Sequence, residues 1–77
     1  MNKPRRKELA EAVELLRRAM DIIESVSEQE QEAYDNMPEG LQESERGEQM
    51  SEYIDTLEEA RYEVEEMIDS LDEIVEG

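Results

Sequence analysis

The side chains that could take part in chemistry in this chain are five serines and 24 carboxylates. Nucleophilic and acid–base catalysis need a nucleophile, a base and a pocket that excludes water, and the chain contains no histidine and no cysteine to activate its serines. Abundant carboxylates do not by themselves form an acid–base pair, because a helix exposes such groups without enclosing a cleft. The sequence therefore predicts a protein that is not an enzyme and has no catalytic residues.

Two metal-binding arrangements can be compared with the sequence, and neither fits. A calcium loop beginning at Asp35 would place Gly40 at its turn position, but its last ligand position would hold Arg46. A dimetal bundle needs inward-facing glutamates and histidines, whereas Glu30 is the one glutamate at a predicted core position. We therefore expect no metal site and no cofactor.

Two amphipathic segments must position the carboxylates. Apolar residues recur at steps of three and four from Leu9 onward and again from Met50 onward, a spacing typical of α-helices. The sequence predicts an all-α fold, an antiparallel two-helix hairpin that forms one domain over residues 1–77. Its helices are expected over residues 3–34 and 44–76, with a connector over residues 35–43.

The hinge between the helices is marked by Pro38, which disfavours helical geometry at the residue before it. Gly40 is expected to relax the backbone, and Ser44 to cap the second helix. The hinge side chains are predicted to close the end of the hairpin, with partner binding as the alternative. They are Met37, Pro38, Gly40, Leu41 and Arg46.

Heptad analysis assigns a core stripe to each helix. Position a holds Leu9, Leu16 and Ile23, then Met50, Leu57, Val64 and Leu71; position d holds Ala12, Ala19, Val26 and Ala33, then Tyr53, Ala60, Met67 and Ile74. Further apolar residues would stay partly exposed to water in a lone hairpin, because so short a chain buries only a small core. Homodimerisation into a four-helix bundle would cover them, and docking on another protein is the alternative. This predicted oligomer core is Val13, Leu15, Met20, Ile22, Ile54, Ile68 and Val75.

The formal net charge of −16 is distributed unevenly. Residues 1–20 carry +3 and residues 21–77 carry −19, so the basic end meets acidic residues only if the chain folds back. A small domain needs a net charge of about 2–8 for solubility, so the excess indicates a function. The negative field repels nucleic acid and anionic membranes and favours a partner protein with a basic surface.

Carboxylates along the second helix approach the charge density of DNA, which suggests an enzyme that binds nucleic acid as the partner. The alternative is a structural or adaptor hairpin that self-associates and keeps its carboxylates solvated. With no cysteine and no apolar run of membrane-spanning length, we expect a cytoplasmic protein. The predicted acidic binding face is Glu45, Glu48, Glu52, Asp55, Glu59, Glu63, Glu66, Asp69, Asp72 and Glu73.

The segment from Gln31 to Met50, QEAYDNMPEGLQESERGEQM, resembles a pattern in small acidic helical proteins of bacterial phages and mobile elements. No site residue is carried over, because that group has no catalytic motif. The resemblance implies action in a bacterial host cell as an inhibitor of host defence, such as a DNA mimic of the anti-CRISPR or anti-restriction type.

Overall fold

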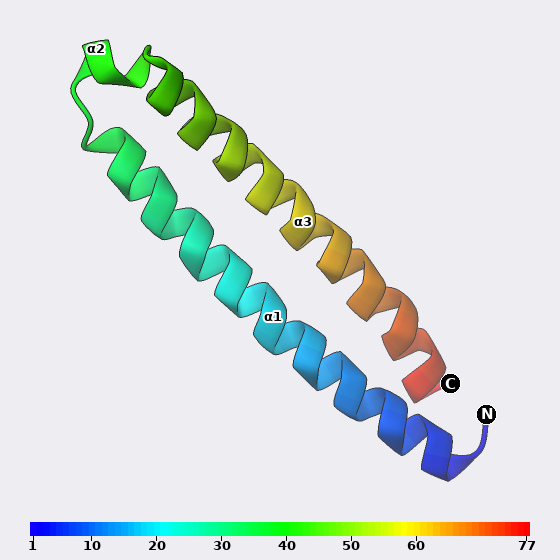
Figure 1. Ribbon diagram of the computed structural model, residues 1–77. Helices are drawn as coiled ribbons and strands as arrows, with labels where there is room; N and C mark the ends of the chain where they lie inside the picture. Colours follow the sequence, from blue (N-terminus) through cyan, green and yellow to red (C-terminus); the bar gives the residue numbers. More distant parts are fainter.

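The computed structural model describes all 77 residues and contains three helices and no strand. They are α1 (Lys3–Asp35), α2 (Glu39–Gln42) and α3 (Glu45–Glu76). Helices α1 and α3 run antiparallel and side by side, so both termini lie at one end of a rod of 58 × 14 × 13 Å (Figure 1). The predicted all-α hairpin is confirmed, and the connector adds one turn of helix, α2. No helix has an apolar stretch long enough to cross a membrane.

Both long helices begin at polar caps. The Asn2 side chain accepts a hydrogen bond from the Arg5 amide at 3.0 Å, and Pro4 occupies the first turn, where its missing N–H removes no helical hydrogen bond. The Ser44 hydroxyl accepts a hydrogen bond from the Gly47 amide at 3.4 Å, which confirms Ser44 as the cap of α3.

The seam between α1 and α3 uses two positions per heptad in each helix. Val13, Ile54 and Ile68 are the most deeply buried side chains, with exposed fractions of 3%, 5% and 3%. The other seam residues are half-buried. They are Leu9, Leu16, Met20, Ile23, Ser27, Glu30 and Tyr34 on α1, and Met50, Leu57, Arg61, Val64, Leu71 and Val75 on α3.

The predicted core was half right. The predicted a positions lie in the seam, but the second seam position comes four residues after each a residue and not three. On α1 the residues three positions after each a residue are mostly alanines, whereas those four positions after it include Val13 and Met20. Burying the larger side chains removes more apolar area from water. The predicted d residues Val26, Tyr53 and Met67 are consequently exposed.

Candidate functional site

The acidic stripe is a row of carboxylates on the outer side of α3. Its members are all exposed and follow one another at steps of three and four residues, which keeps them on one side of a helix. Tyr62 takes one place in this row. The acidic stripe consists of Glu45, Glu48, Glu52, Asp55, Glu59, Glu66, Asp69, Glu73 and Glu76.

The structure therefore brings together eight of the ten residues predicted for the acidic face. Glu63 is exposed but lies outside the row, and Asp72 is half-buried beside α1. The sequence prediction omitted Glu76, although its spacing from Glu73 continues the three- and four-residue pattern. A stricter use of the heptad repeat would have found Glu76 and excluded Asp72.

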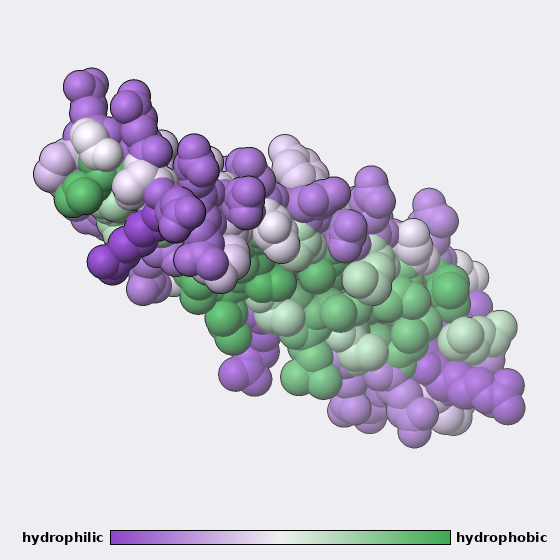
Figure 2. All heavy atoms as spheres, turned by 45° about the horizontal axis from the view of Figure 1, so that its top comes forward, coloured by the Kyte–Doolittle hydropathy of each residue, from purple (hydrophilic) through white to green (hydrophobic).

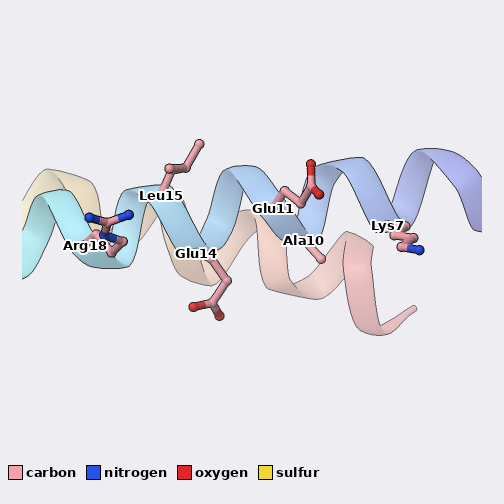
Figure 3. A pocket seen from close by; sticks show the side chains of 6 residues that line it. All are labelled: Lys7, Ala10, Glu11, Glu14, Leu15 and Arg18. Carbon is pink, nitrogen blue, oxygen red and sulfur yellow. The ribbon is translucent and has the colours of Figure 1, made fainter.

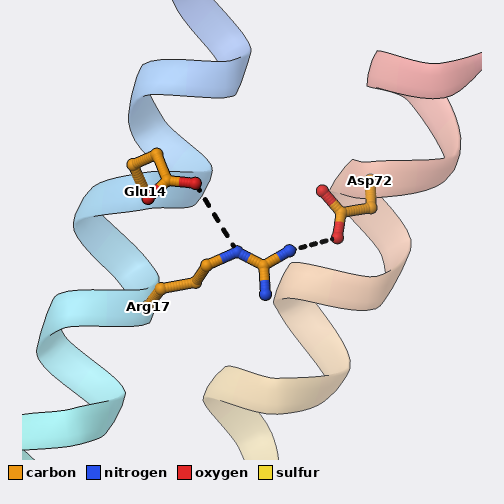
Figure 4. A network of polar contacts seen from close by, with 3 residues as sticks. All are labelled: Glu14, Arg17 and Asp72. Carbon is orange, nitrogen blue, oxygen red and sulfur yellow. Dashed lines mark hydrogen bonds and ion pairs between the residues drawn. The ribbon is translucent and has the colours of Figure 1, made fainter.

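One ion-pair network joins the two helices (Figure 4). The Arg17 guanidinium lies 2.7 Å from an oxygen of Asp72 on α3 and 3.8 Å from an oxygen of Glu14 on its own helix. These are the only ion pairs within 4.0 Å, so the predicted pairing of the basic end with α3 is limited to Arg17. The remaining 22 of the 24 carboxylates have no cation at that distance.

The tip of the hairpin is held by local hydrogen bonds. The Gln42 side-chain amide donates to the Tyr34 carbonyl at 2.9 Å, which ties α2 to the end of α1, and the Ser44 hydroxyl donates to the Leu41 carbonyl. Met37 is half-buried and helps to close the end, whereas Leu41 is half-exposed. Pro38 precedes α2, and Arg46 lies in the first turn of α3 beside a shallow hollow.

The glycine that shapes the tip is Gly47, which the sequence analysis did not single out. A Cβ atom at Gly47 would collide with the backbone carbonyls of Leu41 and Gln42, so α2 packs directly on the start of α3. The relaxation of the backbone expected at Gly40 is not seen. Gly40 lies inside α2, has no positive φ angle, and faces open space.

The apolar face is a second hydrophobic surface, separate from the seam. Its large side chains are exposed: Leu15, Ile22 and Val26 on α1, and Tyr53, Met67 and Ile74 on α3. Both helices use the same two heptad positions for the seam. The residue immediately before the second seam position therefore lies on the same side of the antiparallel pair in α1 and in α3. Figure 2 shows apolar side chains gathered in one continuous area over the half of the rod that contains the termini.

The predicted oligomer core divides between these two surfaces. Leu15 and Ile22, 64% and 62% exposed, belong to the apolar face. Val13, Ile54 and Ile68 are buried between α1 and α3, and Met20 and Val75 are half-buried there, so these five are not free to meet a second copy. The expected partial exposure in a lone hairpin was wrong for Val13, Ile54 and Ile68, which fill the seam, whereas Met20 and Val75 do stay partly exposed.

The hollow drawn in Figure 3 lies on the outer surface of α1, where Lys7, Glu11, Glu14 and Arg18 surround Ala10 and Leu15. All of its lining residues come from one helix, and Leu15 points away from α3, so no second element closes over it. The aspartate and glutamate side chains do not gather in any group that could hold a metal ion.

Comparisons of the chain with protein-family models, with curated proteins and with solved structures find no match in any of the three. By its own geometry, the chain is an acidic helical hairpin that exposes two distinct surfaces, the acidic stripe and the apolar face.

Proposed function

We propose that this hairpin is a non-enzymatic interaction module whose acidic stripe binds a basic surface of another protein. The observation that carries the proposal is the unpaired state of 22 carboxylates, nearly all of them exposed. Like charges at this density repel one another and reduce the stability of the folded chain. A partner that supplies arginines and lysines would relieve that repulsion on binding.

The spacing of the charges suggests which basic surface. Helix α3 carries 13 carboxylates on 32 residues, nine of them on the acidic stripe, and its length of about 48 Å gives about one charge per 3.7 Å when all 13 are counted. One strand of DNA carries a phosphate about every 3.4 Å. We therefore propose a partner whose cleft normally holds nucleic acid, and a role as an inhibitor in the cytoplasm of a phage-infected bacterium. The carboxylates are carried by an ordered helix, so little backbone conformational entropy would be lost on binding.

A second candidate function is self-association into a homodimeric four-helix bundle. The exposed apolar face favours it, because monomeric proteins seldom leave a continuous apolar area of this kind uncovered. In this reading the hairpin is a structural or adaptor element. The two functions use different surfaces, so a dimer could still present its acidic stripes.

Capture from a nuclease-treated extract of the bacterial host tests the acidic stripe. The immobilised chain should retain a protein that is released when salt is raised from about 0.1 M to about 0.5 M, because salt screens exposed charges. The retained protein should bind DNA when purified, and the hairpin should compete with that DNA. A partner that withstands the salt step, or one that does not compete, would contradict the proposal.

Two charge-reversed chains make the test specific. Glu52, Glu59 and Glu66 on the acidic stripe are changed to Lys in one, and Glu11, Glu24 and Glu28 on α1 are changed to Lys in the other. Both triple substitutions shift the net charge equally, and all six glutamates are exposed. The stripe variant should lose the partner and the α1 variant should keep it; equal losses would mean that overall charge, and not the stripe, is recognised.

A further inference from the structure

We propose that the apolar face is covered by a second copy of the chain, with the two hinge tips at the same end of the bundle. The two-fold axis would then run along the rod, placing α1 of each copy over α3 of the other. This inference rests on the proposed self-association and adds its surface and its orientation. Three observations support it: the exposed area, the order of large and small side chains, and the charge of each helix.

The hairpin exposes more surface than a compact protein of its size. A folded monomer of 9.0 kDa is expected to expose about 4,900 Å². This chain exposes 6046 Å², an excess of about 1,200 Å². A stable protein interface buries about 800 Å² on each partner, so the excess is larger than the area that one such interface needs.

The relative height of the helices decides which side chains would meet. At mid-length, the polar groove on the opposite side of the hairpin is lined by residues 24, 27 and 28 of α1 and by residues 58, 61 and 62 of α3. Residue 26 therefore lies near the height of residue 60. A two-fold axis along the rod keeps each residue of the second copy at the same height as in the first.

At the predicted d positions, large side chains then face small ones across the interface. Four layers follow at heptad spacing: Ala12 with Ile74, Ala19 with Met67, Val26 with Ala60, and Ala33 with Tyr53, each pair joining α1 of one copy to α3 of the other. Alternating large and small side chains pack without voids. Tips at opposite ends would pair α1 with α1 and α3 with α3, which places Ala12 against Ala33 and Tyr53 against Ile74.

Charge favours the same orientation. Helix α1 carries a net −3 and α3 a net −11, so pairing unlike helices sets −3 against −11 twice. Pairing like helices would set −11 against −11, which costs more in repulsion. The unlike pairing also places the basic residues 1–20 of each copy, net +3, beside the acidic end of α3 of the other.

Sedimentation equilibrium tests the surface. The wild-type chain should sediment as a dimer, twice the 9.0 kDa of the monomer. Ile22→Glu should weaken the dimer at least about 100-fold while helical content stays, because Ile22 is 62% exposed in the hairpin. Tyr62→Glu is the matched control: Tyr62 is equally exposed but lies on the polar side, so its dimer should persist.

A wild-type chain that stays monomeric at about 0.1 mM would overturn both the self-association and this inference, leaving the face to a different protein. A dimer that Ile22→Glu leaves intact would overturn the surface alone. Should Ile22→Glu unfold, the milder Ile22→Ser provides the same comparison at a position outside the seam.

Spin labels test the orientation without touching the interface. The chain has no cysteine, and Gly40 faces open space, so Gly40→Cys gives a single label at the tip. Pulsed EPR on the dimer should give a distance less than half the 58 Å length of the rod. A distance close to the full rod length would show tips at opposite ends and overturn the orientation while keeping the dimer.

Discussion

Met67 and Ile68 are neighbours in the chain and differ almost completely in environment. Ile68 is 3% exposed in the seam, whereas Met67 is 49% exposed on the apolar face. One residue turns a helix by about 100°, so the step from one to the other leads from the interior of the hairpin to its surface. Hydrophobicity alone does not separate the two stripes; on α1, the larger side chains at the seam positions do.

The largest effect should come from opening the seam. Ile68→Ala is expected to lower the free energy of unfolding by about 2–4 kcal/mol, because it removes buried methyl groups and leaves a cavity. Met67→Ala should cost less than about 1 kcal/mol in the monomer, where Met67 already contacts water. Urea unfolding followed by circular dichroism, at concentrations too low for self-association, measures both.

Equal losses of stability for Ile68→Ala and Met67→Ala would mean that the seam uses a different set of heptad positions. Repeating the Met67→Ala measurement at high protein concentration sharpens the comparison. Its loss of stability should grow there relative to wild type if Met67 is covered in a dimer, since association stabilises the folded state by mass action.

The tip offers a second contrast, between Gly47 and Gly40. Gly47→Ala should destabilise the hairpin by about 1–3 kcal/mol, because the new Cβ atom collides with backbone carbonyls that cannot turn aside. Gly40→Ala should be neutral or stabilise by up to about 1 kcal/mol, because alanine favours the helical conformation of α2 and meets no atom. Thermal unfolding of the two variants measures both effects. A neutral Gly47→Ala would mean that α2 is not held against the start of α3.

Much of the fold could be predicted because its signals are local. The three- and four-residue spacing indicated both long helices, Pro38 marked the interruption, and Ser44 marked the start of α3. The antiparallel direction followed from the uneven charge, and the Arg17–Asp72 pair shows such a contact.

The phase of the seam could not be predicted with the same security, because each helix offers apolar residues at two adjacent positions, about 100° apart, for the second place in the seam. Alanines at positions 12, 19 and 33 match the heptad pattern as well as Val13 does, and only packing against the other helix separates them. For the same reason, the predicted oligomer core included Ile54 and Ile68, which lie in the seam, and omitted Met67 and Ile74, which lie on the apolar face. Gly47 was missed because the need for it arises from α2 folding back, a tertiary contact.

The smallest effect should come from the polar side, where Arg17 bridges Glu14 and Asp72. Arg17→Ala is expected to lower the free energy of unfolding by less than about 1 kcal/mol, since the side chain is 46% exposed and water screens the pair. The loss should shrink further when salt is raised to about 1 M, where the screening length is about 3 Å. Arg18→Ala is the matched control, because Arg18 has no ion pair on α3. A loss for Arg17→Ala as large as that for Ile68→Ala would mean that the ion pair, and not the apolar seam, holds the two helices together.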